Sequence, residues 1–108
     1  MRVTIGLAQI YPKLADLKYN LNKHLDYVNQ AAEQGVDLLV FPELSMTGYQ
    51  LQYLVPEVAM HTTPDDPIFA QLIEASHKLD IVVGFVHEDK RNRFYITDAY
   101  LSGGEVVH

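Results

Sequence analysis

Hydrophobic residues form short continuous runs that alternate with evenly spaced apolar stripes. Two nearly continuous runs, at residues 36–41 and 81–86, are typical of strands buried on both faces of a parallel sheet. Residues 3–10 are rich in β-branched side chains and predict a first strand. Residues 94–101 predict a fourth strand, and a fifth begins at residues 105–108 after a glycine turn. The runs therefore predict a five-stranded sheet.

The stripes between these runs predict two helices. Apolar residues recur at spacings of three and four across residues 17–32, with polar residues on the opposite side. Asp16 is a candidate N-cap for this helix, and Gly35 is a candidate C-terminal stop. The sequence Asp65-Asp66-Pro67 begins a second helix, whose apolar face extends over residues 68–79. A strand, a helix and a strand in this order make a βαβ unit, so we expect an α/β fold.

Composition narrows the classes of protein that fit. The chain has 108 residues, of which 48% are hydrophobic and 20% charged, as in a single globular domain. No apolar run approaches the ~20 residues that a membrane helix needs, so no membrane partner is expected. The chain has no cysteine, which excludes a disulfide scaffold, a thiolate zinc site and a cysteine nucleophile within it.

Charge and histidine spacing give further expectations. The net charge is −6, and the basic cluster of Lys90, Arg91 and Arg93 adjoins Glu88 and Asp89, which indicates a solvated turn rather than a nucleic-acid site. The five histidines lack the spacing of metal ligands, so no metal site is expected. We expect His24, near the apolar stripe, at the boundary of the core. The first residues lack the long apolar region of a signal peptide, so we expect a cytoplasmic protein.

The segment most informative about chemistry follows the strand predicted at residues 36–41. Glu43 lies where this strand gives way to a loop, and ligands of open α/β sheets bind outside the carboxyl ends of strands. Pro42 ends the pairing of the strand because it offers no N–H donor. Its neighbours Phe41 and Leu44 would remove water from the carboxylate, as at the sites of general bases. On these grounds alone a surface or capping glutamate remains an alternative.

The sequence Phe41-Pro42-Glu43-Leu44-Ser45-Met46-Thr47-Gly48-Tyr49 closely resembles the glutamate motif of the nitrilase superfamily, the carbon–nitrogen hydrolases. The resemblance extends over the whole chain through features that match in order: Ala8-Gln9, Asn20, Ala31-Ala32, Gly35-Val36-Asp37, Ile81 to Phe85, Phe94-Tyr95, Ala99, and Gly104 to Val107. It implies the N-terminal part of a four-layer αββα sandwich. Residues 1–108 would then form an incomplete domain that ends before the catalytic lysine and cysteine of the family.

The resemblance also implies a mechanism. Family members cleave nonpeptide carbon–nitrogen bonds in nitriles, amides, ureido compounds or glutamine through a cysteine nucleophile, a lysine that stabilises the oxyanion and a glutamate base. By motif match the base is Glu43, while the lysine and cysteine would follow His108. The chain alone would then be inactive, whereas the full-length protein would need no cofactor and would form a homo-oligomer. Tyr49 and Tyr53 would lie at the rim of the substrate pocket, unless Tyr53 only packs the loop down.

Two other functions stay open at this point. The chain could be a non-catalytic α/β module that uses the same scaffold for binding or assembly. It could also be the glutaminase portion of a glutamine-dependent synthetase. One departure from the family pattern is Thr97-Asp98, which stands before Ala99 where the family often has Asn-Ser or Asn-Thr. This departure leaves the subfamily open.

Overall fold

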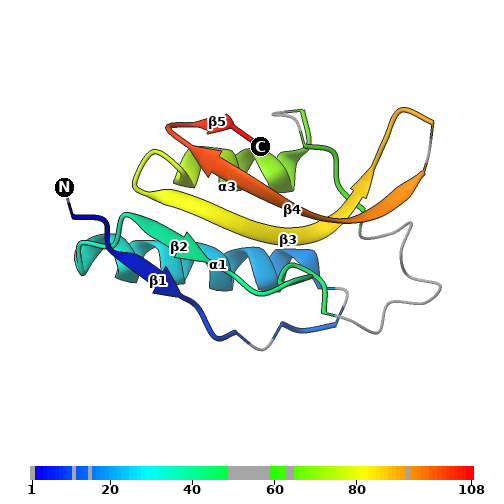
Figure 1. Ribbon diagram of the computed structural model, residues 1–108. Helices are drawn as coiled ribbons and strands as arrows, with labels where there is room; N and C mark the ends of the chain where they lie inside the picture. Colours follow the sequence, from blue (N-terminus) through cyan, green and yellow to red (C-terminus); the bar gives the residue numbers. More distant parts are fainter. Residues whose placement is uncertain (1, 11, 15, 49–58, 63–64, 92) are drawn as a thin grey trace.

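The centre of the structure is a five-stranded sheet whose strand order follows the chain, β1-β2-β3-β4-β5 (Figure 1). Strands β1 (Ile5–Leu7), β2 (Leu38–Val40) and β3 (Asp80–Glu88) are parallel. Strands β4 (Phe94–Ser102) and β5 (Glu105–Val106) continue the sheet in antiparallel pairs. The computed structural model describes residues 2–10, 12–14, 16–48, 59–62, 65–91 and 93–108.

Helices α1 (Leu17–Glu33) and α3 (Pro67–Ala75) both lie behind the sheet in Figure 1. The predicted starts of both helices are confirmed. The Asp16 carboxylate accepts a hydrogen bond from the backbone N–H of Tyr19 at 3.0 Å. The Asp66 carboxylate accepts from two N–H groups in the first turn of α3, and Pro67 occupies a position where no N–H is needed. Among the helices of the described residues, none has the length and apolar character that crossing a membrane requires.

The hydrophobic core fills the space between this helical layer and the sheet. One side chain in two along each long strand points into it, since strand residues alternate between faces. The rings of Phe69 from α3 and Phe85 from β3 lie 5.1 Å apart at its centre. The other fully or nearly fully buried members of the core include Leu21, Val28, Leu39, Leu72, Ile81, Val83, Ala99 and Leu101.

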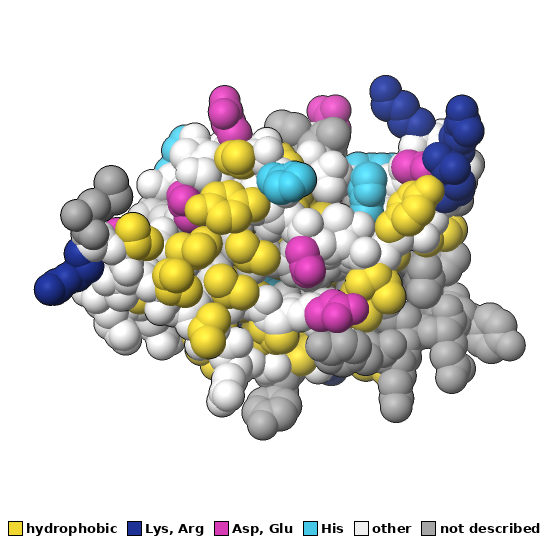
Figure 2. Space-filling view, viewed as in Figure 1, with side chains coloured by type: hydrophobic (Ala, Val, Ile, Leu, Met, Phe, Trp, Pro, Cys, Tyr) yellow, Lys and Arg dark blue, Asp and Glu magenta, His cyan; other side chains and the backbone are white. Residues whose placement is uncertain are grey.

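The opposite face of the sheet carries no helix in the part of the chain that is described. Several of its apolar side chains are exposed, as Leu7 at 78% and Ile96 at 64% show, and Figure 2 shows hydrophobic side chains gathered over it. Leu38 and Val82 are only half-buried. The prediction that the strand at residues 36–41 is buried on both faces is therefore wrong for this chain, because both helices cover the same face. In β3, Val82 is half-buried, whereas the four residues 83–86 are all buried.

The hairpin between β4 and β5 confirms the predicted glycine turn. Gly104 has a φ of +81° and donates a backbone hydrogen bond to Ser76 Oγ at 2.9 Å, at the C-terminal end of α3. The strands themselves are shorter than predicted at the N-terminal half: residues 3–10 and 36–41 contribute only three paired residues each. Strand β3 is longer than predicted, since it includes His87 and Glu88.

Gly84 of β3 lies directly against the backbone that follows β2. A Cβ atom at this position would be 2.5 Å from the backbone nitrogen of Leu44 and 3.0 Å from the carbonyl oxygen of Pro42. Backbone atoms cannot move aside as the end of a flexible side chain can. Glycine at position 84 is therefore what allows the segment after β2 to pack on β3.

Replacing Gly84 with alanine should reduce the free energy of unfolding by about 2 kcal/mol, the usual cost of overpacking. Urea denaturation measures this loss. Gly6→Ala is the matched control, because the atoms nearest to its new Cβ belong to the side chains of Leu39 and Val36, both at 3.2 Å, and not to the backbone. Equal losses for the two variants would contradict the assignment.

Candidate active site

Glu43 follows the carboxyl end of β2, which is where the sequence predicts the site. It belongs to a turn of residues 42–48, here called the Glu43 turn. Its side chain is exposed, whereas its neighbours Phe41 and Leu44 are 3% and 4% exposed and point into the protein. The prediction that these neighbours remove water from the Glu43 carboxylate is therefore wrong within the described chain.

The Glu43 turn is held tightly by its own backbone and by β3. The N–H of Ser45 donates to the carbonyl of Pro42 at 3.1 Å, and the N–H of Gly48 donates to the carbonyl of Leu44 at 2.8 Å. Leu44 has a φ of +51°, a left-handed conformation that a leucine adopts only where its surroundings hold it there. The N–H of Met46 donates to the carbonyl of Gly84 at 3.1 Å. The turn is thus fastened to the central strand.

Apolar side chains of the Glu43 turn also pack in two separate hydrophobic clusters. Met46 is fully buried in the main core, together with Phe41. Leu44 packs with Val86 in a second, smaller cluster. The side chains on either side of Glu43 therefore anchor the turn and leave the carboxylate outside.

Asn20 of α1 connects three segments beneath the turn. Its side chain is fully buried, and its Nδ2 donates to the carbonyl of Met46 at 2.6 Å and to the carbonyl of Lys13 at 2.8 Å. Its Oδ1 accepts from the N–H of Lys13 at 2.7 Å. The sequence marked Asn20 only as a feature of the family pattern; the structure gives it a clear role in holding the Glu43 turn against α1.

His24 of α1 lies beside Asn20 and is fully buried, so its expected place at the boundary of the core is wrong. Its Nδ1 lies 2.6 Å from the carbonyl oxygen of Asn20, and its Nε2 lies 2.8 Å from Ser45 Oγ. Its ring centroid is 4.1 Å from that of Phe41. Burial lowers the pKa of His24 to about 4, although the hydrogen bond to Asn20 acts in the opposite direction. The sequence carries a signal for the burial of His24, because Asn20, His24 and Val28 are spaced by four and therefore share one face of α1.

Tyr49 and Tyr53, expected at the pocket rim, lie outside the described residues. Asp98, which the sequence marked only as a departure from the family, lies across Gly84 from the turn: a Cβ at Gly84 would be 3.0 Å from Asp98 Oδ1. Asp98 is exposed, so it adds a second carboxylate to this edge of the sheet.

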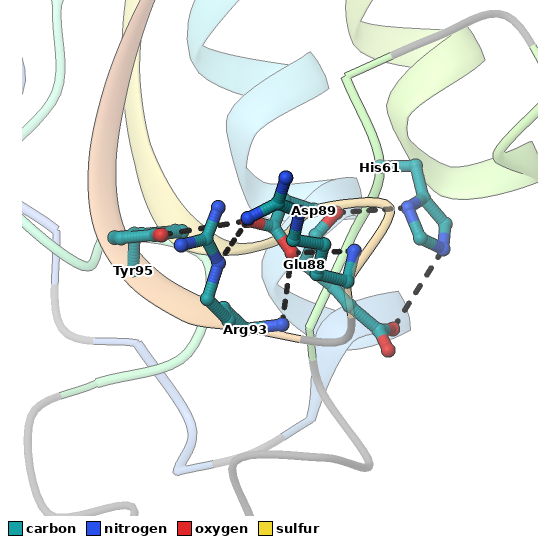
Figure 3. Close-up of polar contacts among 6 residues, drawn as sticks. His61, Glu88, Asp89, Arg93 and Tyr95 are labelled. Atoms are coloured by element: carbon teal, nitrogen blue, oxygen red, sulfur yellow. Dashed lines mark hydrogen bonds and ion pairs between the residues drawn. The ribbon is translucent and has the colours of Figure 1, made fainter.

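A separate polar cluster occupies the tip of the β3–β4 hairpin (Figure 3). Asp89 accepts from Arg93 Nε at 2.8 Å and from the N–H groups of Arg91 and Arg93 at 2.9 Å. These hydrogen bonds, above all those from Arg93, lower the pKa of Asp89 below its usual value. His61 Nδ1 lies 3.0 Å from the carbonyl oxygen of Glu88. The cluster is an internally paired turn, as the sequence indicated. Within the described ranges, no three His, Asp or Glu side chains gather as metal ligands.

The low pKa of His24 links stability to pH. The ordinary pKa is 6.5 and the folded value is about 4, so between these values the unfolded chain binds a proton that the native state does not. The free energy of unfolding should therefore fall as the pH falls through this window, by roughly 3 kcal/mol in total. Urea denaturation of the full-length protein across this window measures the slope. It should flatten in His24→Gln and persist in His77→Gln, a change at an exposed histidine; an unchanged slope in His24→Gln would disprove the linkage.

Comparisons with known proteins agree with this geometry. The family model described as carbon-nitrogen hydrolase matches residues 4–107. A glutamine-dependent NAD(+) synthetase of Acinetobacter baylyi is 31% identical over 95% of this chain, which spans 19% of that relative. An arylacetonitrilase of Aspergillus niger is 28% identical over 98% of the chain, which spans 36% of that relative.

A solved structure supports the same fold. The crystal structure of an amidase from Nesterenkonia sp. superimposes with a TM-score of 0.82 at 25% identity, over 98% of this chain and 41% of the amidase. The chain thus spans less than half the length of these relatives. The described sheet, its helical layer and the turn after β2 make up an α/β fold of the nitrilase type. With a family model matching nearly its whole length, the chain belongs to the carbon–nitrogen hydrolase family.

Proposed function

We propose that this chain supplies the general base, Glu43, of an enzyme that cleaves a nonpeptide carbon–nitrogen bond. The observation that carries the proposal is the combination of an exposed carboxylate with a rigidly held turn at the carboxyl end of β2. Residues 1–108 would form the first part of the catalytic domain. The lysine and the cysteine would come from the portion of the relatives' length that this chain does not span.

The chemistry of such a site proceeds in two stages. The Glu43 carboxylate takes the proton of the cysteine thiol, and the sulfur attacks the substrate carbon. The lysine stabilises the negative oxygen of the tetrahedral intermediate. When the carbon–nitrogen bond breaks, the leaving nitrogen takes the proton from Glu43, and a thioester remains on the cysteine. Glu43 then takes a proton from the water molecule that attacks the thioester and returns it to the cysteine sulfur when the carbon–sulfur bond breaks, which releases the acid and restores the thiol.

The exposure of Glu43 is consistent with this proposal. A base must be open to the groups with which it exchanges protons, and here those groups lie on other segments. The segments that carry the cysteine and the lysine would also cover Glu43 and exclude water from the site. For the Nesterenkonia amidase, one mutant structure is described as showing covalent addition of the acetamide moiety of fluoroacetamide at the active site cysteine.

Glutamine is the substrate that the similarities favour first, because the relative at 31% identity is a glutamine-dependent enzyme. Simple amides, nitriles and ureido compounds follow. The reaction needs no cofactor, since every step is a proton transfer or an acyl transfer. The proposal includes a homo-oligomer without nucleic-acid or membrane partners. It also includes a cytoplasmic location, where a reducing environment keeps a cysteine nucleophile free.

Glu43→Gln in the full-length protein should lower kcat/KM for ammonia release at least about 100-fold, since the amide cannot accept the thiol proton. The control is Glu33→Gln, an exposed change at the end of α1 that should leave activity within two-fold. Activity of Glu43→Gln comparable to the control would exclude Glu43 as the base. A full-length protein without any hydrolytic activity would support a non-catalytic module instead.

A panel of glutamine, a simple amide, a nitrile and a ureido compound tests the substrate class separately. Ammonia release should be at least about 10-fold faster with glutamine than with the other compounds, which is a difference of ~1.4 kcal/mol in transition-state binding. Preference for a nitrile, with glutamine inert, would reject the glutaminase assignment while leaving the role of Glu43 intact.

A further inference from the structure

Two fully buried polar side chains beneath the Glu43 turn take no part in the proposed chemistry. His24 belongs to α1, and Ser45 belongs to the turn itself; both are 0% exposed. We propose that the hydrogen bond between His24 and Ser45 is a positioning device that fixes the direction of the Glu43 carboxylate. This inference rests on the role proposed for Glu43.

The donor and acceptor of this bond follow from its surroundings. The carbonyl oxygen of Asn20 can only accept, so His24 Nδ1, 2.6 Å away, carries the ring proton and donates it. In a neutral imidazole Nε2 is then an acceptor, and the Ser45 hydroxyl donates to it across 2.8 Å. Because burial holds the pKa of His24 at about 4, the ring stays neutral at physiological pH and Nε2 keeps this role.

Stability alone does not account for this pair. Replacing both partners of a buried hydrogen bond with apolar groups of similar shape is often nearly neutral for stability. His24 lies against Phe41 within the core, a site that an apolar side chain could fill. A hydrogen bond differs from apolar packing because it depends on direction. It can therefore fix an orientation that apolar packing alone does not specify.

The bond acts two residues from Glu43. Between them Leu44 has a φ of +51°, so a shift of Ser45 reaches Glu43 through a single residue held in a left-handed conformation. Ser45 Oγ also lies 3.4 Å from the N–H of Gly84, so the same hydroxyl touches both α1 and β3. A misplacement of about 1 Å at a catalytic group can lower a rate about 100-fold. Loss of this bond should therefore lower kcat more than it lowers the free energy of unfolding.

The test uses the full-length protein and the pair of changes His24→Leu and Ser45→Ala, alone and together. The double variant removes both polar partners, so its urea midpoint should remain close to that of the unchanged protein. Its kcat for ammonia release should nevertheless fall at least about 10-fold, with KM changed less than two-fold, because only the position of the base is altered.

Two further variants keep the test decisive. His24→Gln can present an amide oxygen to Ser45, so its kcat should exceed that of His24→Leu. Ser76→Ala removes a buried hydroxyl remote from the Glu43 turn, one that donates to the carbonyl of Ile73 at the end of α3, and should leave kcat unchanged. Should the double variant fail to fold, the kcat of Ser45→Ala, compared with that of Ser76→Ala, decides the question.

The outcomes separate this inference from the proposed function. If Glu43→Gln is inactive while the double variant, or Ser45→Ala in its place, keeps full kcat, the positioning role is rejected and the proposed function stands. If Glu43→Gln is active, both are rejected. A kcat lowered in parallel with the urea midpoint across all variants would assign His24 and Ser45 a merely structural role.

Discussion

The close approach of the Glu43 turn to β3 at Gly84 is the contact on which the rest of the site depends. Position 84 has no side chain, so the backbone of Pro42 and Leu44 lies directly on the strand. The hydrogen bond from Met46 to the Gly84 carbonyl then fixes the turn, and the buried side chains of α1 meet it from behind. The position of Glu43 is thus set by one strand and one helix together.

The one-sided helical layer gives this arrangement its asymmetry. Both helices pack on the same face, where Phe69, Phe85 and their neighbours make the core. The other face presents Ile5, Leu7 and Ile96 to solvent. Glu43 follows β2 at the carboxyl edge of this sheet and is itself exposed. The Glu43 carboxylate and the apolar face are therefore both available to structure that packs against them.

Local patterns in the sequence predict the helices, the strands and the position of Glu43 after β2. Asp16, Asp66 and Pro67 mark helix starts through chemistry confined to one turn, and these predictions are confirmed. His24 and the exposure of Glu43 depend instead on which segments meet in space. The partner of His24 is 21 residues away in sequence, and no periodicity along α1 identifies it. Burial on both faces of β2 was wrongly predicted because an apolar run does not say which layers cover it.

The match between strand order and chain order has a consequence for synthesis on the ribosome. Each new strand can join the free edge of the strands already made, without insertion between them. The Glu43 turn is made early, but Gly84, on which Ser45 rests, follows 39 residues later. At typical elongation rates of about 5–20 residues per second, Gly84 is synthesised roughly 2–8 seconds after Ser45. During that interval the nascent chain carries its candidate base on a segment that has not yet taken its final shape.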